Sequence, residues 1–204
     1  MKRVLVSLLS LCLASILCGQ SYDRLSTFEE NQFGRNIHVN GSFNALRQVR
    51  QFWNQECDRL KNDKYNISFC GNGEAVMKVT IPVRLLFQAN DSALQAQADG
   101  MLRPFLRLLR GSDAKASLVI ACYSDNNGSN TYLDEMTLTR AKEIQSWLNK
   151  QGVTASVHTY GVGNHVPLNE NSDMAEREQN RRVSLYFVPN KQMMKLAKKQ
   201  KLIN

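Results

Sequence analysis

Apolar residues recur every three or four positions between residues 43 and 60, in the stretch FNALRQVRQFWNQECDRL. This spacing places them on one side of a helix, so the pattern predicts an amphipathic helix over about 43–61. A face this apolar has to be covered, by the rest of the chain in the default interpretation or by a partner protein in the alternative. The recurring residues are Phe43, Leu46, Val49, Phe52, Trp53, Cys57 and Leu60.

The hydrophobic period changes to two after the turn-forming CGNG. From Met77 to Phe87 apolar and polar residues mostly alternate, which predicts a strand with one buried face. Pro82 cannot donate to a strand ladder, so this part of the strand is expected at an edge or beyond the sheet. Three later runs are also expected to be strands, namely ASLVIACY, SVHTYGVG and RVSLYFVP.

Two helices are predicted between these strands. The first covers about 94–110 and should be kinked at Pro104, and the second runs to about residue 151, where Gly152 can end it. Residues 164–180 are polar. The order predicts an α+β fold, β-α-β-α-β-β, with helices packed on a mixed four-stranded sheet. We expect a polar segment with the amphipathic helix at 20–74, this domain at 75–189 and a basic tail at 190–204.

The first residues have the layout of a secretory signal peptide. Lys2 and Arg3 precede the apolar run VLVSLLSLCLASILC and the small residues around Gly19. At ~15 residues the run is shorter than the ~20 that cross a bilayer as a helix. We expect residues 1–19 to be removed and the chain to be exported. The alternative is a lipoprotein with a lipid on Cys18.

The remaining cysteines and the charge narrow the possible functions. In an exported chain Cys57 and Cys70 can close a short disulfide or stay reduced, and Cys122 is expected to be a buried, inert thiol. No metal or other cofactor is expected. The net charge of +8 indicates a basic surface rather than nucleic-acid binding, because no basic cluster is interleaved with aromatic residues. The five lysines of the tail are expected in solvent, with attraction to anionic lipid or glycan phosphate as the alternative.

A motif follows the second strand in YSDNNGSNTYLDEMTLTRA, residues 123–141. Together with GVGNHVP at 161–167 and NRRV at 180–183, it resembles the OmpA-like domain, whose pattern runs His-Thr-Asp, Gly, Tyr-Asn, Leu-Ser, Arg-Ala and later Asn-Arg-Arg-Val. The spacing from Asp125 to Arg140 is that of the family. The resemblance covers about Met77 to Pro189, more than half of the chain left after cleavage.

The resemblance implies binding of peptidoglycan through the free end of diaminopimelate, which carries an ammonium and a carboxylate on one carbon. Asp125 would accept from the ammonium, and Arg140 would hold the carboxylate through paired N–H donors, a geometry that lysine cannot copy. Asn127 and Asn90 align with further family contacts. One of Arg181 and Arg182 is expected to brace the loop or Asp125 and the other to be exposed, and Arg182 is carried as a ligand candidate.

The chain departs from the family pattern at several positions. Leu133 stands where the family has asparagine, which removes a polar contact and a helix cap, and Asp134 is expected to take over the N-cap role. Tyr123 replaces the family histidine and is expected to be a packing position.

These features predict a binding protein that tethers an outer-membrane or envelope component to the cell wall, in the periplasm or on the periplasmic face of the outer membrane. The alternative is a structural or interaction protein that has lost ligand binding and docks an envelope partner through the helix at 43–60. An enzyme is not expected, because the sequence offers no acid pair, metal cluster or activated nucleophile at a suggestive spacing.

Overall fold

The structure is a computed structural model that describes residues 37–61 and 63–203. The expected signal peptide, the Cys18 alternative and most of the polar stretch 20–42 lie outside the described residues. The order in the sheet is β1-β2-β5-β3-β4, with β3 and β4 parallel and the other pairs antiparallel. The strands are β1 (Asn66–Cys70), β2 (Val76–Pro82), β3 (Ala116–Tyr123), β4 (Val157–Gly163) and β5 (Arg182–Pro189).

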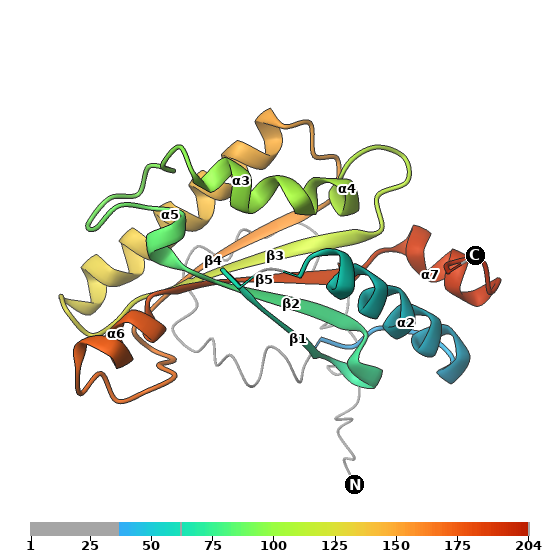
Figure 1. The fold of residues 1–204 in the computed structure, drawn as a ribbon, viewed down its shortest axis with the longest axis horizontal. Helices are drawn as coiled ribbons and strands as arrows, with labels where there is room; N and C mark the ends of the chain where they lie inside the picture. Colours follow the sequence, from blue (N-terminus) through green and yellow to red (C-terminus); the bar gives the residue numbers. More distant parts are fainter. Residues whose placement is uncertain (1–36, 62, 204) are drawn as a thin grey trace, which may run out of the picture.

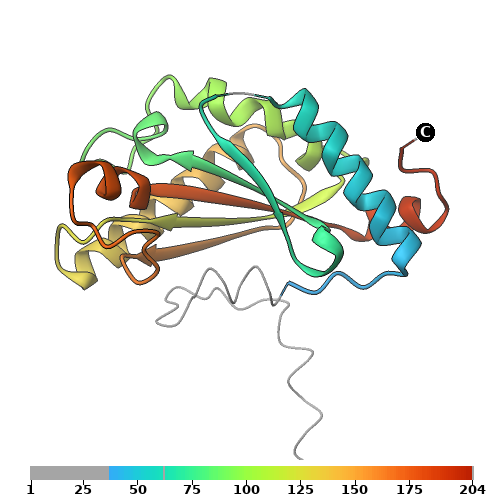
Figure 2. The same ribbon diagram turned by 60° about the horizontal axis from the view of Figure 1, so that its bottom comes forward.

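The helices are distributed over one face and the two ends of this sheet. In Figures 1 and 2, α3, α4 and α5 cover one face, α2 and α7 lie side by side at one end, and α6 lies at the opposite end. Their bounds are α2 (Phe43–Arg59), α3 (Ala98–Leu102), α4 (Leu106–Leu109), α5 (Asn130–Lys150), α6 (Met174–Asn180) and α7 (Lys191–Lys198).

The α+β class and the mixed sheet are confirmed, but the sheet has five strands where four were expected. The additional strand, β1, pairs antiparallel with β2 across the CGNG turn. Its pairing with β2 ends at Thr80, whereas β2 continues along β5 to Pro82. Val83 N–H donates to Arg181 C=O, next to β5. Because successive backbone nitrogens of a strand point to opposite sides, the Pro82 nitrogen points toward the β1 side, beyond the last residue of β2 that pairs with β1. The missing donor therefore leaves no gap in the ladder.

The segment expected to be one kinked helix is shorter and broken. It starts at Ala98, changes to a 3₁₀ turn at Arg103–Phe105 and resumes as α4. Pro104 lies at the start of the 3₁₀ turn, where its missing N–H costs no interior helix hydrogen bond. The break lets Leu102, Phe105 and Leu109 all reach the core.

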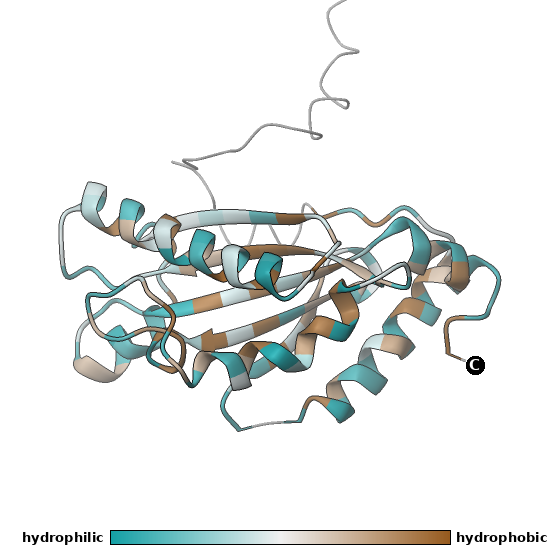
Figure 3. Ribbon diagram, turned by 90° about the horizontal axis from the view of Figure 1, so that it is seen from above, coloured by the Kyte–Doolittle hydropathy of each residue, from teal (hydrophilic) through white to brown (hydrophobic). Residues whose placement is uncertain are grey.

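α2 packs on the rest of the fold, as the default interpretation predicted. Val49 and Trp53 are fully buried, and the Trp53 indole N–H donates to Ala75 C=O at 2.7 Å. Phe43 was expected on the buried stripe, but it is 78% exposed. The buried side also carries Glu56, whose carboxylate pairs with Arg59 and Arg107. Figure 3 shows hydrophobic residues recurring along the strands and between the hydrophilic positions of the helices.

The expected basic tail is an ordered helix that belongs to the fold. Met193 and Ala197 are buried against α2, while the lysines of α7 remain exposed. The Asn190 side chain fixes the start of α7, since its Oδ1 accepts from Met193 N–H at 2.8 Å and its Nδ2 donates to Ala114 C=O at 2.6 Å. The tail is therefore amphipathic rather than wholly solvated.

The motif GVG brings α5 unusually close to β4. A Cβ added to Gly161 would lie 2.4 Å from the Leu138 nitrogen, and one on Gly163 would lie 2.1 Å from Asp134 Oδ1. Gly163 N–H also donates to Thr137 Oγ1 at 3.0 Å. Only glycine permits this approach, and the approach sets the height of α5 above the sheet.

The cysteines that the structure describes, Cys57, Cys70 and Cys122, are free thiols. Cys57 and Cys70 are half-buried and not joined by a disulfide, which decides between the two expectations for this pair. Cys122 is completely buried as expected, and burial raises the pKa of its thiol to about 12. Within residues 37–61 and 63–203, no helix is long and apolar enough to cross a membrane, and no group of His, Cys, Asp and Glu is arranged to hold a metal ion.

Candidate functional site

A cavity of about 330 Å³ opens where the loop after β3 meets α5, the loop after β2 and α6. Four of the five ligand-binding residues predicted from the sequence line it, namely Asp125, Arg140, Asn127 and Asn90. Arg182 does not line it. The other lining residues are Val83, Arg84, Phe87, Gln88, Ala89, Ser124, Tyr132, Leu133, Met136, Met174, Glu178 and Arg181.

Asp125 follows the end of β3, where Ser124 N–H still donates to Gly163 C=O at 2.8 Å. Its side chain is nearly buried and held by two donors. Oδ1 accepts from Asn127 N–H at 3.2 Å, and Oδ2 accepts from Arg181 Nη1 at 2.5 Å. The strand end, the turn and Arg181 therefore fix the carboxylate at the wall of the cavity.

Arg140 reaches the same cavity from α5, and its side chain is only 3% exposed. Nε donates to Asp91 C=O at 2.8 Å and Nη2 to Gln88 C=O at 3.4 Å, and the guanidinium carbon lies 5.3 Å from the centre of the Phe87 ring. Burial lowers the pKa of Arg140, which nearby Cys122 partly offsets. A guanidinium remains charged under any ordinary condition, so a cation faces this cavity permanently.

Arg140 is the cation of the cavity that lacks a carboxylate partner. Arg84 pairs with Glu178, and Arg181 pairs with both Glu178 and Asp125. Among the residues that the structure describes, no carboxylate lies within salt-bridge distance of Arg140. A buried cation held only by carbonyl dipoles favours the approach of an anion.

The loop after β2 depends on Arg140 for its shape. Two of its carbonyls, at Gln88 and Asp91, accept from the guanidinium. Between them Asn90 has a φ of 57°, a left-handed conformation that asparagine adopts more readily than most residues. This conformation places Asn90 at the cavity wall, exposed to solvent.

The motif Asn180-Arg181-Arg182 has three distinct structural roles. Asn180 is completely buried and organises the preceding loop, accepting from Leu168 N–H at 2.7 Å and donating to Asn169 C=O at 3.0 Å. Burial alone would lower the pKa of Arg181, but its hydrogen bonds to Glu178 and Asp125 raise it. Arg181 is thus the arginine that braces Asp125.

Arg182 was expected to brace the loop or Asp125, to be exposed, or to bind ligand, and in the structure it is buried and contacts the loop at Val166. It is 2% exposed, with its guanidinium carbon 3.8 Å from the centre of the Tyr123 ring and Nη2 donating to Val166 C=O at 3.0 Å. The stacking on Tyr123 accords with the expected packing role of that tyrosine. Arg181, the C-cap of α6, lines the cavity, whereas Arg182, the first residue of β5, does not.

The expectation that Asp134 is the N-cap of α5 is wrong. Ser129, not Asp134, caps α5, because its Oγ accepts from Tyr132 N–H at 3.3 Å. Asp134 instead accepts from His165 Nε2 at 2.9 Å. Leu133 is buried and lines the cavity, so an apolar wall stands where the family has an amide.

The mouth of the cavity carries exposed apolar side chains. Tyr132 is 46% exposed and Met174 is 70% exposed, two of the four large hydrophobic residues exposed to this extent among those described. They lie on α5 and α6, and both line the cavity. An apolar rim around two fixed, opposite charges suits a ligand with a charged head and an aliphatic stem.

Comparison with known proteins identifies the domain. Residues 86–181 match the OmpA family, and this chain carries an OmpA-like domain. A search of the curated proteins found no match.

Solved structures share this fold. A MotB-like protein from Desulfovibrio vulgaris superposes with a TM-score of 0.61 at 20% identity, covering 72% of this chain and 97% of that one. The cell wall anchor of the type VI secretion system of Pseudomonas aeruginosa gives 0.54 at 18% identity, covering 70% and 97%. At these identities the likeness shows the fold.

Sequence reasoning missed part of the cavity wall. Arg84 and Phe87 come from the segment after β2 and Met174 comes from α6, and no local pattern assigns these residues to a binding site. Arg181 was named only as one of two possible braces.

Proposed function

We propose that this protein binds peptidoglycan non-covalently, through the free zwitterionic end of diaminopimelate in the peptide stems. One observation carries the proposal. The nearly buried Arg140 faces the cavity without a carboxylate partner among the described residues, while Asp125 presents a fixed carboxylate to the same cavity. An anion site and a cation site in one small cavity match a ligand that carries both charges on one carbon.

Both groups have hydrogen-bonding capacity left for a ligand. Arg140 has five N–H donors, and carbonyls of described residues use two of them, which leaves three for a carboxylate. Asp125 has about four lone-pair sites, of which Asn127 and Arg181 use two. The ammonium of the ligand would approach the remaining oxygens beside Asn127 and Asn90, whose side chains are exposed at the wall.

The apolar Leu133 lowers the affinity we expect for a single stem. One charge-assisted hydrogen bond contributes ~1.5–3 kcal/mol, so the missing amide would weaken one site about ten- to a hundredfold. A wall polymer presents many stems close together, and multivalency offsets part of such a loss. We therefore propose weak single-site binding and retention on the intact wall.

The proposed context is a bacterial envelope. The similar structures include a MotB-like protein and a cell wall anchor, and the apolar segment that begins the sequence suits export. We propose that the mature protein works in the periplasm or on the periplasmic face of the outer membrane of a Gram-negative bacterium, and tethers an envelope component to the wall. The role proposed is binding and not catalysis.

Asp125→Asn tests the part of the cavity that would bind the ammonium of the ligand. Asparagine keeps the size of the side chain but removes the negative charge that would attract the ammonium. We expect binding to purified sacculi, measured by co-sedimentation across a protein titration, to weaken about ten- to a hundredfold. The matched control is Asp113→Asn, an exposed aspartate that does not line the cavity, which should bind like the wild type. Equal retention of both variants would reject the proposal.

A second candidate is an interaction protein that keeps the fold without binding ligand, and Leu133 is the observation that favours it. Its partner would not use the apolar stripe of α2, because Val49 and Trp53 are already buried within the fold. Wild-type protein that fails to sediment with sacculi, yet melts cooperatively, would support this candidate.

A further inference from the structure

A second cavity, of about 550 Å³, lies between α7, the end of β5 and the segment 38–40. Four lysines line it, Lys191, Lys195, Lys198 and Lys199, which we call the lysine face. Their backbone positions, i, i+4, i+7 and i+8 along α7 and its C-cap Lys199, fall on one side of the helix. We propose that the lysine face binds the surface of an anionic phospholipid bilayer.

The positive charge of the lysine face is not neutralised within the fold. No aspartate or glutamate lines the cavity, and no carboxylate of a described residue forms a salt bridge with any of the four ammonium groups. Other surface cations behave differently, as Lys61 pairs with Asp58 and Arg103 with Asp99. Four unpaired ammonium groups on one short helix create a local field that attracts an anionic partner.

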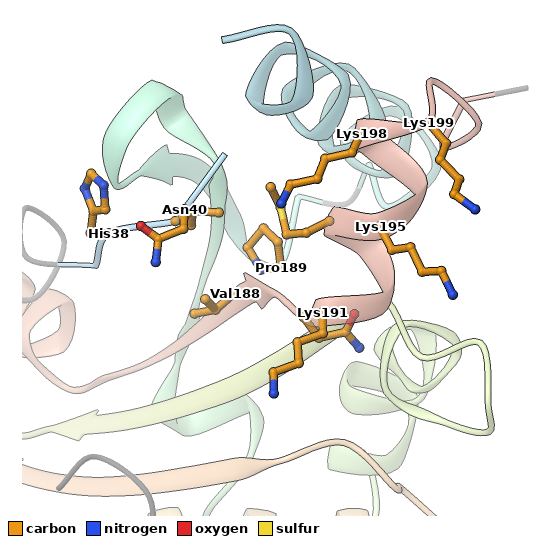
Figure 4. A pocket seen from close by; sticks show the side chains of 11 residues that line it. His38, Asn40, Val188, Pro189, Lys191, Lys195, Lys198 and Lys199 are labelled. Carbon is orange, nitrogen blue, oxygen red and sulfur yellow. The ribbon is translucent and has the colours of Figure 1, made fainter. Parts of the chain in front are cut away.

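The arrangement suits an extended anionic surface better than one small anion. Figure 4 shows the lysine side chains spreading from α7 in different directions, with Lys198 over the cavity and Lys195 and Lys199 turned away from it. From Lys191 to Lys198 the helix rises about 10 Å. A single phosphate cannot contact groups this far apart, whereas a bilayer presents one negative charge after another.

The floor beside the lysines is apolar, which favours lipid over a soluble polyanion. Val39, Val188, Pro189 and Met194 line the cavity together with the lysines. Lipid carbons below a headgroup would be buried against such a floor, whereas a glycan phosphate or other water-soluble polymer has no apolar part to place there.

The segment that leads into the fold passes along the same cavity. A Cβ added to Gly41 would lie 2.7 Å from Met194 Cε, and Asn72 holds Val39 through two hydrogen bonds of 2.7 and 3.0 Å. Residues 38–40 are therefore held in place as one wall of this cavity.

The lysine face and the cavity of Asp125 lie at opposite ends of the sheet. β5 runs from Arg182, next to the residues that brace Asp125, to Pro189 in the lysine-lined cavity. Its eight residues span roughly 23 Å. If the lysine face lies on a bilayer, the cavity of Asp125 at the other end of the sheet remains free to face the cell wall. The membrane proposal does not depend on wall binding, since each end can be tested without the other's ligand.

The test is co-sedimentation of the mature chain with vesicles of phosphatidylglycerol and phosphatidylcholine, with pure phosphatidylcholine as the neutral arm. We expect binding to the anionic vesicles only, weakening as salt is raised. Each lysine near an anionic surface contributes about fivefold, so replacing all four lysines of the face by glutamine should weaken binding by about six hundredfold. Those side chains are exposed, and the variant should still fold, as circular dichroism would verify.

The matched control replaces four exposed lysines elsewhere by glutamine, Lys61, Lys64, Lys142 and Lys150, which removes the same charge. It should keep most of the vesicle binding. The proposal is overturned if both quadruple variants lose binding equally, since net charge alone then explains it. It is also overturned if wild type binds neutral vesicles as well as anionic ones, or ignores vesicles but binds soluble polyphosphate.

Discussion

Arg140→Lys is expected to weaken binding to sacculi by about a hundredfold, the upper end of the effect of charge-assisted hydrogen bonds. Lysine keeps the charge but loses the planar set of N–H donors that can grip a carboxylate in pairs. It also cannot reproduce both contacts to the carbonyls of Gln88 and Asp91, so the loop that carries Asn90 should shift. The measurement is a sedimentation titration with sacculi, alongside near-ultraviolet circular dichroism to verify the fold.

Arg103→Lys is the matched control for this substitution. Arg103 is exposed, pairs with Asp99 through two hydrogen bonds of 2.8 and 2.9 Å, and lies outside the cavity. The control should bind sacculi like the wild type. If Arg140→Lys also binds like the wild type while remaining folded, the guanidinium does not hold the ligand.

Gly161→Ala is expected to lower the free energy of unfolding by at least about 3 kcal/mol, at the upper end of overpacking effects. The new methyl group would lie 2.4 Å from the Leu138 nitrogen and 2.6 Å from its Cα. These are backbone atoms of α5, so no flexible side chain can move aside. For a chain of this size the expected fall in the melting temperature is about 6–12 °C, measured by thermal unfolding followed by circular dichroism.

Gly100→Ala is the control, and it is expected to change the melting temperature in the opposite direction. An added Cβ at this exposed position of α3 meets no atom within 4 Å, and alanine is favoured over glycine in a helix by about 0.5–1 kcal/mol. This variant should melt slightly above the wild type. If Gly161→Ala melts at the same temperature as Gly100→Ala, then α5 does not lie as close to β4 as the structure indicates.

The elements with a clear hydrophobic period were predictable from the sequence. The long helix ending near Gly152 and the four longest strands follow from apolar runs and alternation, although β2 ends at Pro82 and gives way to a 3₁₀ turn instead of continuing to Phe87. β1 was missed because five residues are too short for alternation to be distinctive, and its pairing with β2 is set by the hairpin. The tail was predicted only as basic and solvated, because the burial of α7 against α2 depends on contacts that no local pattern reveals.

The candidate site was predictable only as far as its motif extends. Asp125 and Arg140 could be paired from the sequence because their spacing matched a known family, not because any periodicity brought them together. Arg182, carried as a ligand candidate, does not line the cavity, because its side chain stacks on Tyr123 and donates to Val166 C=O instead. The Ser129 cap was missed because Ser129 and Asp134 both suit an N-cap, and only the position of the first helical turn decides between them.

The central claim is that the cavity of Asp125 and Arg140 recognises the free zwitterionic end of diaminopimelate. The most direct test is a nuclear magnetic resonance titration of the mature protein with a soluble stem peptide ending in free diaminopimelate, and with the same peptide amidated at that carboxylate. We expect saturable shifts at residues 88–91, 125–128 and 140 with the free peptide, and at least tenfold weaker binding of the amidated one. Equal binding of the two peptides, or shifts confined to other residues, would contradict the claim.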